Sequence, residues 1–185
     1  MKSKVKEKDE SLLIIVLLGL GLFVPAFLGQ LTFLGENRQL IVGTIVNATL
    51  FTCALKINDP KKIIALSVLP SLSSMATGLL FTGLTLYSKV MLPFIWAGNL
   101  SLILCVKYFT KNYKFISSSI VAIIIKVGII YGGFKLMSSL IKFPPKVSTV
   151  FGTTFGINQI YTAVMGLILV LTIIGAKKVN QEKEF

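Results

Sequence analysis

The chain has 185 residues, of which 54% are hydrophobic and 14% are charged, and its mean hydropathy is +0.84. This composition is too apolar for a soluble domain, and several apolar runs approach the roughly 20 residues that a membrane-spanning helix needs. The chain has no histidine, which excludes histidine metal sites, histidine general bases and Ser-His-Asp triads. The formal charge of +12 does not indicate nucleic-acid binding, because the lysines stand between apolar runs, as in membrane proteins. Cys53 and Cys105 lie within apolar runs, so we expect both to be small buried hydrophobes.

The apolar runs predict six transmembrane helices joined by polar connections. They are expected, in chain order, at residues 12–28, 40–55, 63–86, 92–106, 115–136 and 157–176. Because the connections are mostly short, we expect residues 1–185 to form one all-α bundle in a membrane. A lysine-rich start before an apolar run is also the pattern of a signal peptide. The first run is longer than a signal core, however, and no small-x-small cleavage site follows it, so we interpret it as a transmembrane helix.

Features within these elements predict helix ends and helix faces. Pro25 should kink or end the first helix, and Asn58-Asp59-Pro60 should end the second by its turn chemistry. The third helix, interrupted by Pro70, carries a stripe of small polar side chains that either lets another helix approach closely or lines a cavity. The stretch 137–156 is expected to be a long connection, with 152–156 as a flexible loop element.

Basic residues are distributed unevenly between the two ends of such a bundle. With six helices both termini lie on one side, and thirteen of the nineteen lysines and arginines fall on that side, against five on the other; Lys126 lies inside a helix. The positive-inside rule therefore predicts that both termini are cytoplasmic. No internal repeat is evident, which weighs against the inverted-repeat designs of secondary transporters.

Lys126 is the most informative single residue. An ammonium group at mid-helix costs about 2.5–3.5 kcal/mol on insertion scales, so it should face the protein interior and have a partner. All seven carboxylates lie in tails or connections. Lys126 therefore either snorkels or bonds to carbonyl groups, or it serves as the counter-charge for an acidic or strongly polar ligand.

The residue inventory also argues against catalysis and against proton coupling. Proton-coupled transporters need a titratable carboxylate or histidine within the bundle. Membrane hydrolases and metal-dependent transferases need a nucleophile–base pair or clustered acids. These groups are missing, as is a P-loop, so we expect neither enzyme activity, nor a metal or cofactor, nor ATP hydrolysis by this chain.

Polar and aromatic side chains on the second, fourth and sixth helices form a further group. The stretch Met91–Leu104 carries Trp96 and Asn99 where lipid would favour leucine. A side-chain amide in such a helix, taken alone, more often hydrogen-bonds to a neighbouring helix than to a ligand. Together with Lys126, these side chains predict an outward-opening small-molecule pocket with aromatic walls and a few convergent polar groups. The candidate substrate-binding residues are Asn47, Trp96, Asn99, Lys126, Gln159 and Tyr161.

Each candidate is expected to do one of three things. Lys126 would balance an acidic group, and Trp96 and Tyr161 would enclose an apolar or heteroaromatic body. The three amides would hydrogen-bond polar edges of the ligand.

Short motifs along nearly the whole chain resemble the substrate-binding S components of energy-coupling factor (ECF) transporters. The matching pieces are Gly43-Thr44-Ile45-Val46-Asn47-Ala48, Pro70-Ser71-Leu72, Pro93-Phe94-Ile95 with Gly98-Asn99, Lys126 and Gln159. The resemblance implies a prokaryotic cell-membrane receptor that captures a vitamin or related micronutrient near its outer face, under its first, third and fifth loops. It also implies a transmembrane T component and two cytoplasmic ATPases as partners, and release of the cargo by toppling of the S component within the membrane. In place of the family's Ala-x-x-x-Ala surface for the T component, the first helix here has Gly19, Gly21 and Ala26.

Two other functions stay open on the sequence. One is an accessory or structural subunit whose polar residues only hold helices together, and the other is a small channel or secondary carrier that works without ATP. The sequence does not identify the substrate, because a lysine favours an acid-bearing ligand but also donates to neutral carbonyls.

Overall fold

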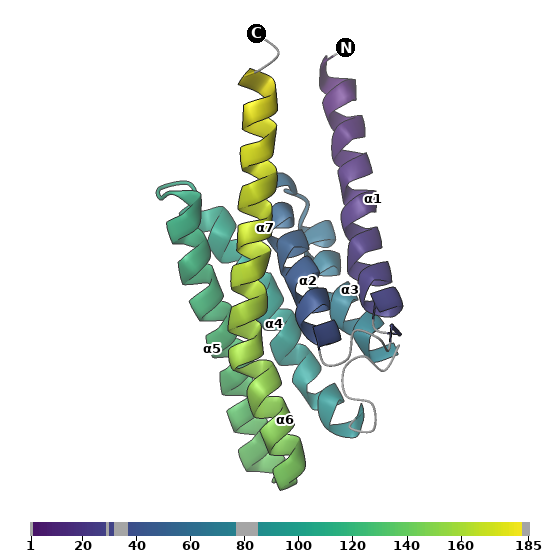
Figure 1. Ribbon diagram of the computed structural model, residues 1–185, viewed down its shortest axis with the longest axis vertical. Coiled ribbons are helices and arrows are strands. Elements are labelled where there is room, and N and C mark those ends of the chain that lie inside the picture. The colour runs from purple at the N-terminus through teal and green to yellow at the C-terminus, as the bar shows by residue number, and fades with distance from the viewer. Residues whose placement is uncertain (1, 29, 32–36, 77–84, 183–185) are drawn as a thin grey trace.

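The computed structural model describes residues 2–28, 30–31, 37–76 and 85–182, with side chains described for residues 11–28, 30–31, 37–76 and 87–175. In these ranges the chain is helical and forms no strand (Figure 1). The helices are α1 (Lys2–Leu28), α2 (Asn37–Lys56), α3 (Pro60–Ala76), α4 (Thr85–Phe109), α5 (Phe115–Ile141), α6 (Pro145–Phe155) and α7 (Ile157–Glu182).

Several helix boundaries differ from those predicted. The helix α1 runs through Pro25 to Leu28, so Pro25 does not end it. The described part of α3 runs to Ala76, and the end of the predicted third helix falls on residues 77–84, which lie outside the described ranges; residues 85–86 belong to α4. The helix α4 already begins at Thr85 and continues through Pro93. Prolines are tolerated within such apolar helices because neighbouring groups satisfy the freed backbone carbonyls.

The turn between α2 and α3 is confirmed. The helix α2 ends at Lys56, and α3 begins at Pro60, a residue that suits the first helical position because its missing N–H is not needed there. The backbone N–H of Lys61 donates to the Asp59 carboxylate at 2.9 Å, as in the start of a capped helix.

The expected long connection at 137–156 is wrong, because most of it is helical. The helix α5 continues to Ile141, and the chain reverses at Lys142, whose φ of 54° is left-handed. The short helix α6 then starts at Pro145 and includes the glycine- and threonine-rich piece expected to be a flexible loop. Its side chains Val147, Phe151 and Phe155 are buried, and their spacing of four residues places them on one helix face.

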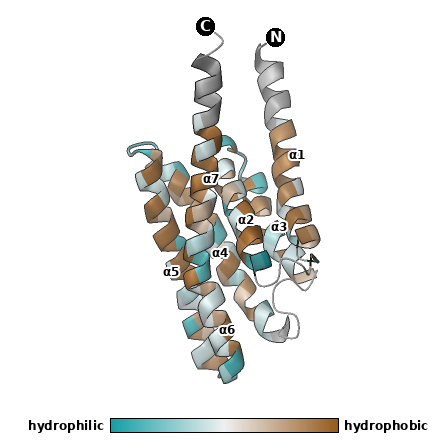
Figure 2. Cartoon of the chain, viewed as in Figure 1, coloured by the Kyte–Doolittle hydropathy of each residue, from teal (hydrophilic) through white to brown (hydrophobic). Residues whose placement is uncertain are grey.

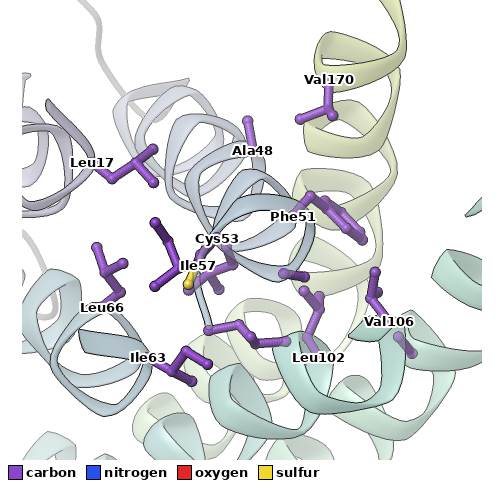
Figure 3. Close-up of a cluster of buried hydrophobic side chains, with 14 of the residues drawn as sticks. Leu17, Ala48, Phe51, Cys53, Ile57, Ile63, Leu66, Leu102, Val106 and Val170 are labelled. Atoms are coloured by element: carbon purple, nitrogen blue, oxygen red, sulfur yellow. The ribbon is translucent and has the colours of Figure 1, made fainter. Parts of the chain in front are cut away.

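A large apolar cluster fills the half of the bundle nearest the chain termini (Figure 3). Phe51 of α2, fully buried, lies at its centre and contacts Phe115 edge-on with ring centroids 6.3 Å apart. Leu17, Leu66, Leu102 and Val170 bring α1, α3, α4 and α7 into the same cluster. Cys53 is also part of it, and Cys105 packs against it half-buried, as expected for small hydrophobes.

The outward surfaces of the bundle are apolar as well. Phe23 is 67% exposed and Ile124 is 65% exposed, and Figure 2 shows hydrophobic residues along the outer helices with hydrophilic ones gathered near the helix ends. Five segments of the described chain are long and apolar enough to cross a membrane: Ser11–Leu28, Asn37–Lys56, Tyr87–Phe109, Phe115–Ile141 and Pro145–Gly175. An apolar exterior of this extent suits hydrocarbon rather than water, so the chain has the character of a multi-pass membrane protein. The helix α3, with 17 residues, is shorter than each of these five segments.

The two ends of the bundle differ in what they carry. Both termini lie at one end, together with the α2–α3 turn and the α4–α5 connection (Figure 1). The connection between α5 and α6 lies at the opposite end. Main packing partners are α4 with α5, α2 with α7, and α1 with α3.

Candidate functional site

A cavity of about 90 Å³ lies among the helices, between helix segments that lie away from the termini in Figure 1. Its wall is built from the first half of α2, the second half of α3, the middle of α4 and α5, the end of α6 and the start of α7. The lining residues are Gln39, Val42, Gly43, Val46, Asn47, Pro70, Ser71, Ser74, Ile95, Asn99, Lys126, Thr154, Phe155, Asn158, Gln159 and Thr162. Ten of these sixteen carry an amide, hydroxyl or ammonium group, which is unusual for the interior of an apolar bundle.

Lys126 supplies the basic side chain of this cavity. Its side chain is 2% exposed, and its Nζ donates to the Asn47 amide oxygen at 2.5 Å. An ammonium group has three N–H donors. Among the described residues no carboxylate pairs with Lys126, so its charge is not neutralised within that part of the chain.

Asn47 connects Lys126 to α7. Its amide nitrogen donates to the Gly43 carbonyl at 2.8 Å and to the Thr162 hydroxyl at 3.2 Å. The Thr162 hydroxyl in turn donates to the Asn158 carbonyl at 2.8 Å. Because the amide nitrogen is used in this way, the amide oxygen is directed toward Lys126, and the three side chains form one buried hydrogen-bonded chain across α5, α2 and α7.

Two glycines allow α2 and α7 to come close enough for that chain. A Cβ on Gly166 would lie 2.7 Å from the Asn47 Cβ, and a Cβ on Gly43 would lie 2.7 Å from the Thr162 Cγ2. Both distances are shorter than van der Waals contact permits, so any larger residue at either position forces the helices apart. Small residues at helix crossings are a general device of membrane bundles.

The α3–α4 side of the cavity is held by two side-chain donors of α4. Asn99, 4% exposed, donates from Nδ2 to the Ser67 carbonyl at 3.0 Å. One turn earlier, Trp96 donates from Nε1 to the Ser71 hydroxyl at 2.7 Å. Ser71 and Ser74 line the cavity. The serines of α3 therefore both accept hydrogen bonds from α4 and face the cavity.

The structure brings four of the six predicted residues together. Asn47, Asn99, Lys126 and Gln159 all line the cavity, and Gln159 also donates to the Thr154 carbonyl at 3.4 Å. Trp96 is half-buried beside the cavity and reaches it only through Ser71. The structure does not bring Tyr161 to this cavity: its side chain is 59% exposed on α7 and is not part of the lining, because a residue adjacent to Thr162 points about 100° away from it on a helix.

Some lining residues were missed at the level of the sequence. Thr162 lies four residues after Asn158 and three after Gln159, a helical spacing that could have indicated a shared face. The sequence predicts that Gln39 lies in the connection before the second helix, but α2 already begins at Asn37, which carries Gln39 to the cavity. Thr154 falls in the predicted flexible loop 152–156 and reaches the cavity through α6.

The described lining of this cavity offers a ligand one basic group and several amides and hydroxyls for hydrogen bonding. No carboxylate, thiol or imidazole lines it among the described residues. In the described ranges, no three metal-ligating side chains lie together. Comparisons of the chain with protein-family models, with curated proteins and with solved structures found no match.

Proposed function

We propose that this chain is the substrate-capture subunit, or S component, of an energy-coupling factor transporter in a prokaryotic cell membrane. It would bind a vitamin or related micronutrient from outside for uptake driven by a transmembrane T component and two cytoplasmic ATPase subunits. The observation that carries the proposal is the buried amino group of Lys126, which lines a cavity among amide and hydroxyl side chains and has no carboxylate partner among the described residues.

The physical reason is the cost of such a charge. A buried cation is tolerated when it is paired or well hydrogen-bonded, and the described residues give Lys126 one amide oxygen. A ligand carboxylate or strongly polar carbonyl would supply the missing acceptors. One contact with the ligand would then both hold the ligand and lower the free-energy cost of burying the Lys126 ammonium group.

The size of the cavity indicates which part of a ligand it holds. Its volume of about 90 Å³ is below the roughly 300–1,000 Å³ of ordinary ligand pockets. We therefore propose that one polar end group of the ligand contacts Lys126, Asn47 and Gln159. The rest of the ligand would extend toward the end of the bundle opposite the termini, which the lysine distribution assigns to the outside.

The test is identification of the bound molecule. Protein purified from cells is extracted with organic solvent, and the extract is analysed by mass spectrometry for an acid-bearing or carbonyl-rich micronutrient. The variant Lys126→Met should retain at least about tenfold less of that molecule, since a hydrogen bond to a charged group contributes roughly 1.5–3 kcal/mol. The control is Lys135→Met, which removes an exposed lysine from the same helix and should retain the molecule fully. Equal retention by Lys126→Met and wild type would remove Lys126 from the site.

An accessory or structural subunit is the second candidate, and one observation favours it. Both Trp96 and Asn99 use their donors on groups of α3, as interhelical glue would. Affinity purification separates the two functions: an S component should bring down ATPase and T subunits or hold a small molecule, whereas a structural subunit should hold no small molecule. A carrier would instead show substrate flux into liposomes without ATP.

A further inference from the structure

A groove lies between α2 and α4 at the end of the bundle that carries both termini, far from the Lys126 cavity. Its volume is about 570 Å³. It is lined by Ala54, Leu55, Asn58, Leu104, Lys107, Tyr108, Thr110 and Lys111. We refer to these eight residues as the α2–α4 groove.

The lining of the α2–α4 groove changes from apolar to cationic along its length. Leu55 and Leu104 lie within the segments Asn37–Lys56 and Tyr87–Phe109, which are apolar enough to cross a membrane. Lys111 lies two residues beyond the end of α4. Leu104 is 48% exposed and Tyr108 is 65% exposed, so the apolar wall is open to the surroundings of the bundle. A hydrocarbon chain fits the inner part, and an anion fits the outer part.

The two lysines of the groove have different roles. The Lys107 ammonium donates to the Ala54 carbonyl at 3.3 Å, to the Ile57 carbonyl at 2.6 Å and to the Asn58 side-chain oxygen at 2.9 Å. All three of its donors are thus used to close the end of α2 against α4. Lys111 is exposed, and no carboxylate of the described residues pairs with it. Lys107 holds the walls of the groove together, and Lys111 presents its ammonium group at the mouth.

The charge around the groove selects an anion. The lysines of the α2–α3 turn and of the α4–α5 connection gather at this end of the bundle: Lys56, Lys61, Lys62, Lys107, Lys111 and Lys114. Among the described side chains at this end, the acid is Asp59, which pairs with Lys62 at 3.6 Å. Cationic side chains at this level of a membrane protein attract anionic headgroups.

We propose that the α2–α4 groove binds one anionic phospholipid, with its phosphate at Lys111 and an acyl chain along Leu55 and Leu104. An acidic protein segment is the weaker occupant, because the inner wall of the groove lies within apolar, membrane-spanning segments that a polar chain would not enter. This lipid site is independent of the function proposed for the Lys126 cavity.

Lipid titration of the purified full-length protein tests the proposal. Native mass spectrometry in detergent would follow binding of dioleoyl-phosphatidylglycerol and dioleoyl-phosphatidylcholine, which have the same acyl chains. Wild type should bind the first phosphatidylglycerol more tightly than the first phosphatidylcholine. Lys111→Gln should weaken that phosphatidylglycerol binding about fivefold, the effect expected of one lysine near a headgroup, and should leave phosphatidylcholine unchanged.

Two further variants locate the lipid. Lys114→Gln makes the same change in charge three residues later, outside the groove lining; it should weaken phosphatidylglycerol binding much less than Lys111→Gln and leave phosphatidylcholine binding unchanged. Leu104→Trp fills the apolar part of the groove and should weaken binding of both lipids.

Several outcomes would overturn the lipid site. Equal loss in Lys114→Gln and Lys111→Gln would mean that only the general surface charge matters. Equal binding of the two lipids by wild type would exclude headgroup recognition, and unchanged binding in Leu104→Trp would exclude the acyl chain. Displacement of phosphatidylglycerol by water-soluble glycerol phosphate at the lipid's own concentration would assign the groove to a free phosphate. Loss of an acidic protein partner in Lys111→Gln with lipid binding intact would assign it to protein docking.

Discussion

Lys107 and Lys126 are two lysines in apolar surroundings, and the protein treats them in opposite ways. Lys107 lies at the end of α4, where its ammonium meets two backbone carbonyls and one side-chain oxygen. Lys126 lies in the middle of α5, where one amide oxygen accepts from it. The end of a helix offers free carbonyls, whereas the middle of a helix offers none. A lysine at a helix end can therefore be satisfied by the fold, while a lysine at mid-bundle needs a partner from elsewhere.

The side chains that surround these two lysines differ as well. Lys107 adjoins the apolar cluster around Phe51, in which side chains fill the space between helices. Lys126 lines a cavity among amides and hydroxyls. Packed apolar side chains therefore surround Lys107, whereas amides and hydroxyls around a cavity surround Lys126. The predictions below test that contrast, from the largest expected effect to the smallest.

Removing the centre of the apolar cluster should have the largest effect on stability. Phe51→Ala takes away a fully buried ring and should lower the free energy of unfolding by about 3–5 kcal/mol. Chemical or thermal unfolding in detergent measures the loss. The control Phe23→Ala deletes a ring that is 67% exposed and should change stability much less; comparable losses in the two variants would contradict a packed centre at Phe51.

Separating α2 from α7 should damage the cavity and the fold together. In Gly166→Leu the first side-chain carbon would stand 2.7 Å from the Asn47 Cβ. We therefore expect a loss of about 1–3 kcal/mol in the free energy of unfolding, together with loss of retained ligand. The matched control is Gly175→Leu on the same helix, where nothing lies within 4 Å of an added Cβ. The control should unfold like wild type, and a wild-type result for Gly166→Leu would refute the close approach.

Replacing each of the two lysines with methionine should affect different properties: Lys107→Met mainly the stability, and Lys126→Met mainly the ligand retention. Lys107→Met leaves the carbonyls of Ala54 and Ile57 without their donor and should cost about 1–3 kcal/mol of stability. Lys126→Met also leaves the buried Asn47 amide oxygen without its donor. Removal of an under-paired buried charge offsets that cost, so the net effect on stability should be about 1 kcal/mol or less. Unfolding in detergent measures both changes. Extraction of bound molecules measures ligand retention, which Lys126→Met should lower at least about tenfold and Lys107→Met should leave unchanged. A larger stability loss for Lys126→Met than for Lys107→Met would contradict the view that the fold satisfies Lys107 and leaves Lys126 under-paired.

The tie between α3 and α4 should have the smallest effect. Trp96→Phe removes the donor to the Ser71 hydroxyl and should cost about 0.5–1.5 kcal/mol, as for other single hydrogen bonds. A double-mutant cycle with Ser71→Ala measures the coupling, and the second substitution should add little once the first is present. Fully additive losses would show that the two side chains do not interact.

Much of the candidate site could be predicted because its polar residues stand out in apolar runs. Lys126 and Asn99 interrupt hydrophobic stretches, and burial of such groups follows from the cost of exposing them to lipid. The aromatic residues gave no comparable signal, since a tryptophan or tyrosine suits a lipid-facing surface as well as a pocket wall. Trp96 is accordingly one hydrogen bond away from the cavity, and Tyr161 lies on the outside of α7.

Local sequence determined the helical, membrane-type character of this protein, the turn at Pro60 and the presence of a cation inside the bundle, because hydropathy, helix period and turn chemistry act over a few residues. Tertiary structure alone decided that Asn47 faces Lys126, 79 residues away, and that α7 presents Thr162 rather than Tyr161 to the cavity. The rotation of a helix about its axis is set by what it packs against. For α7 that is the close contact of Gly43 and Gly166 with side chains across the α2–α7 crossing, which no single helix contains.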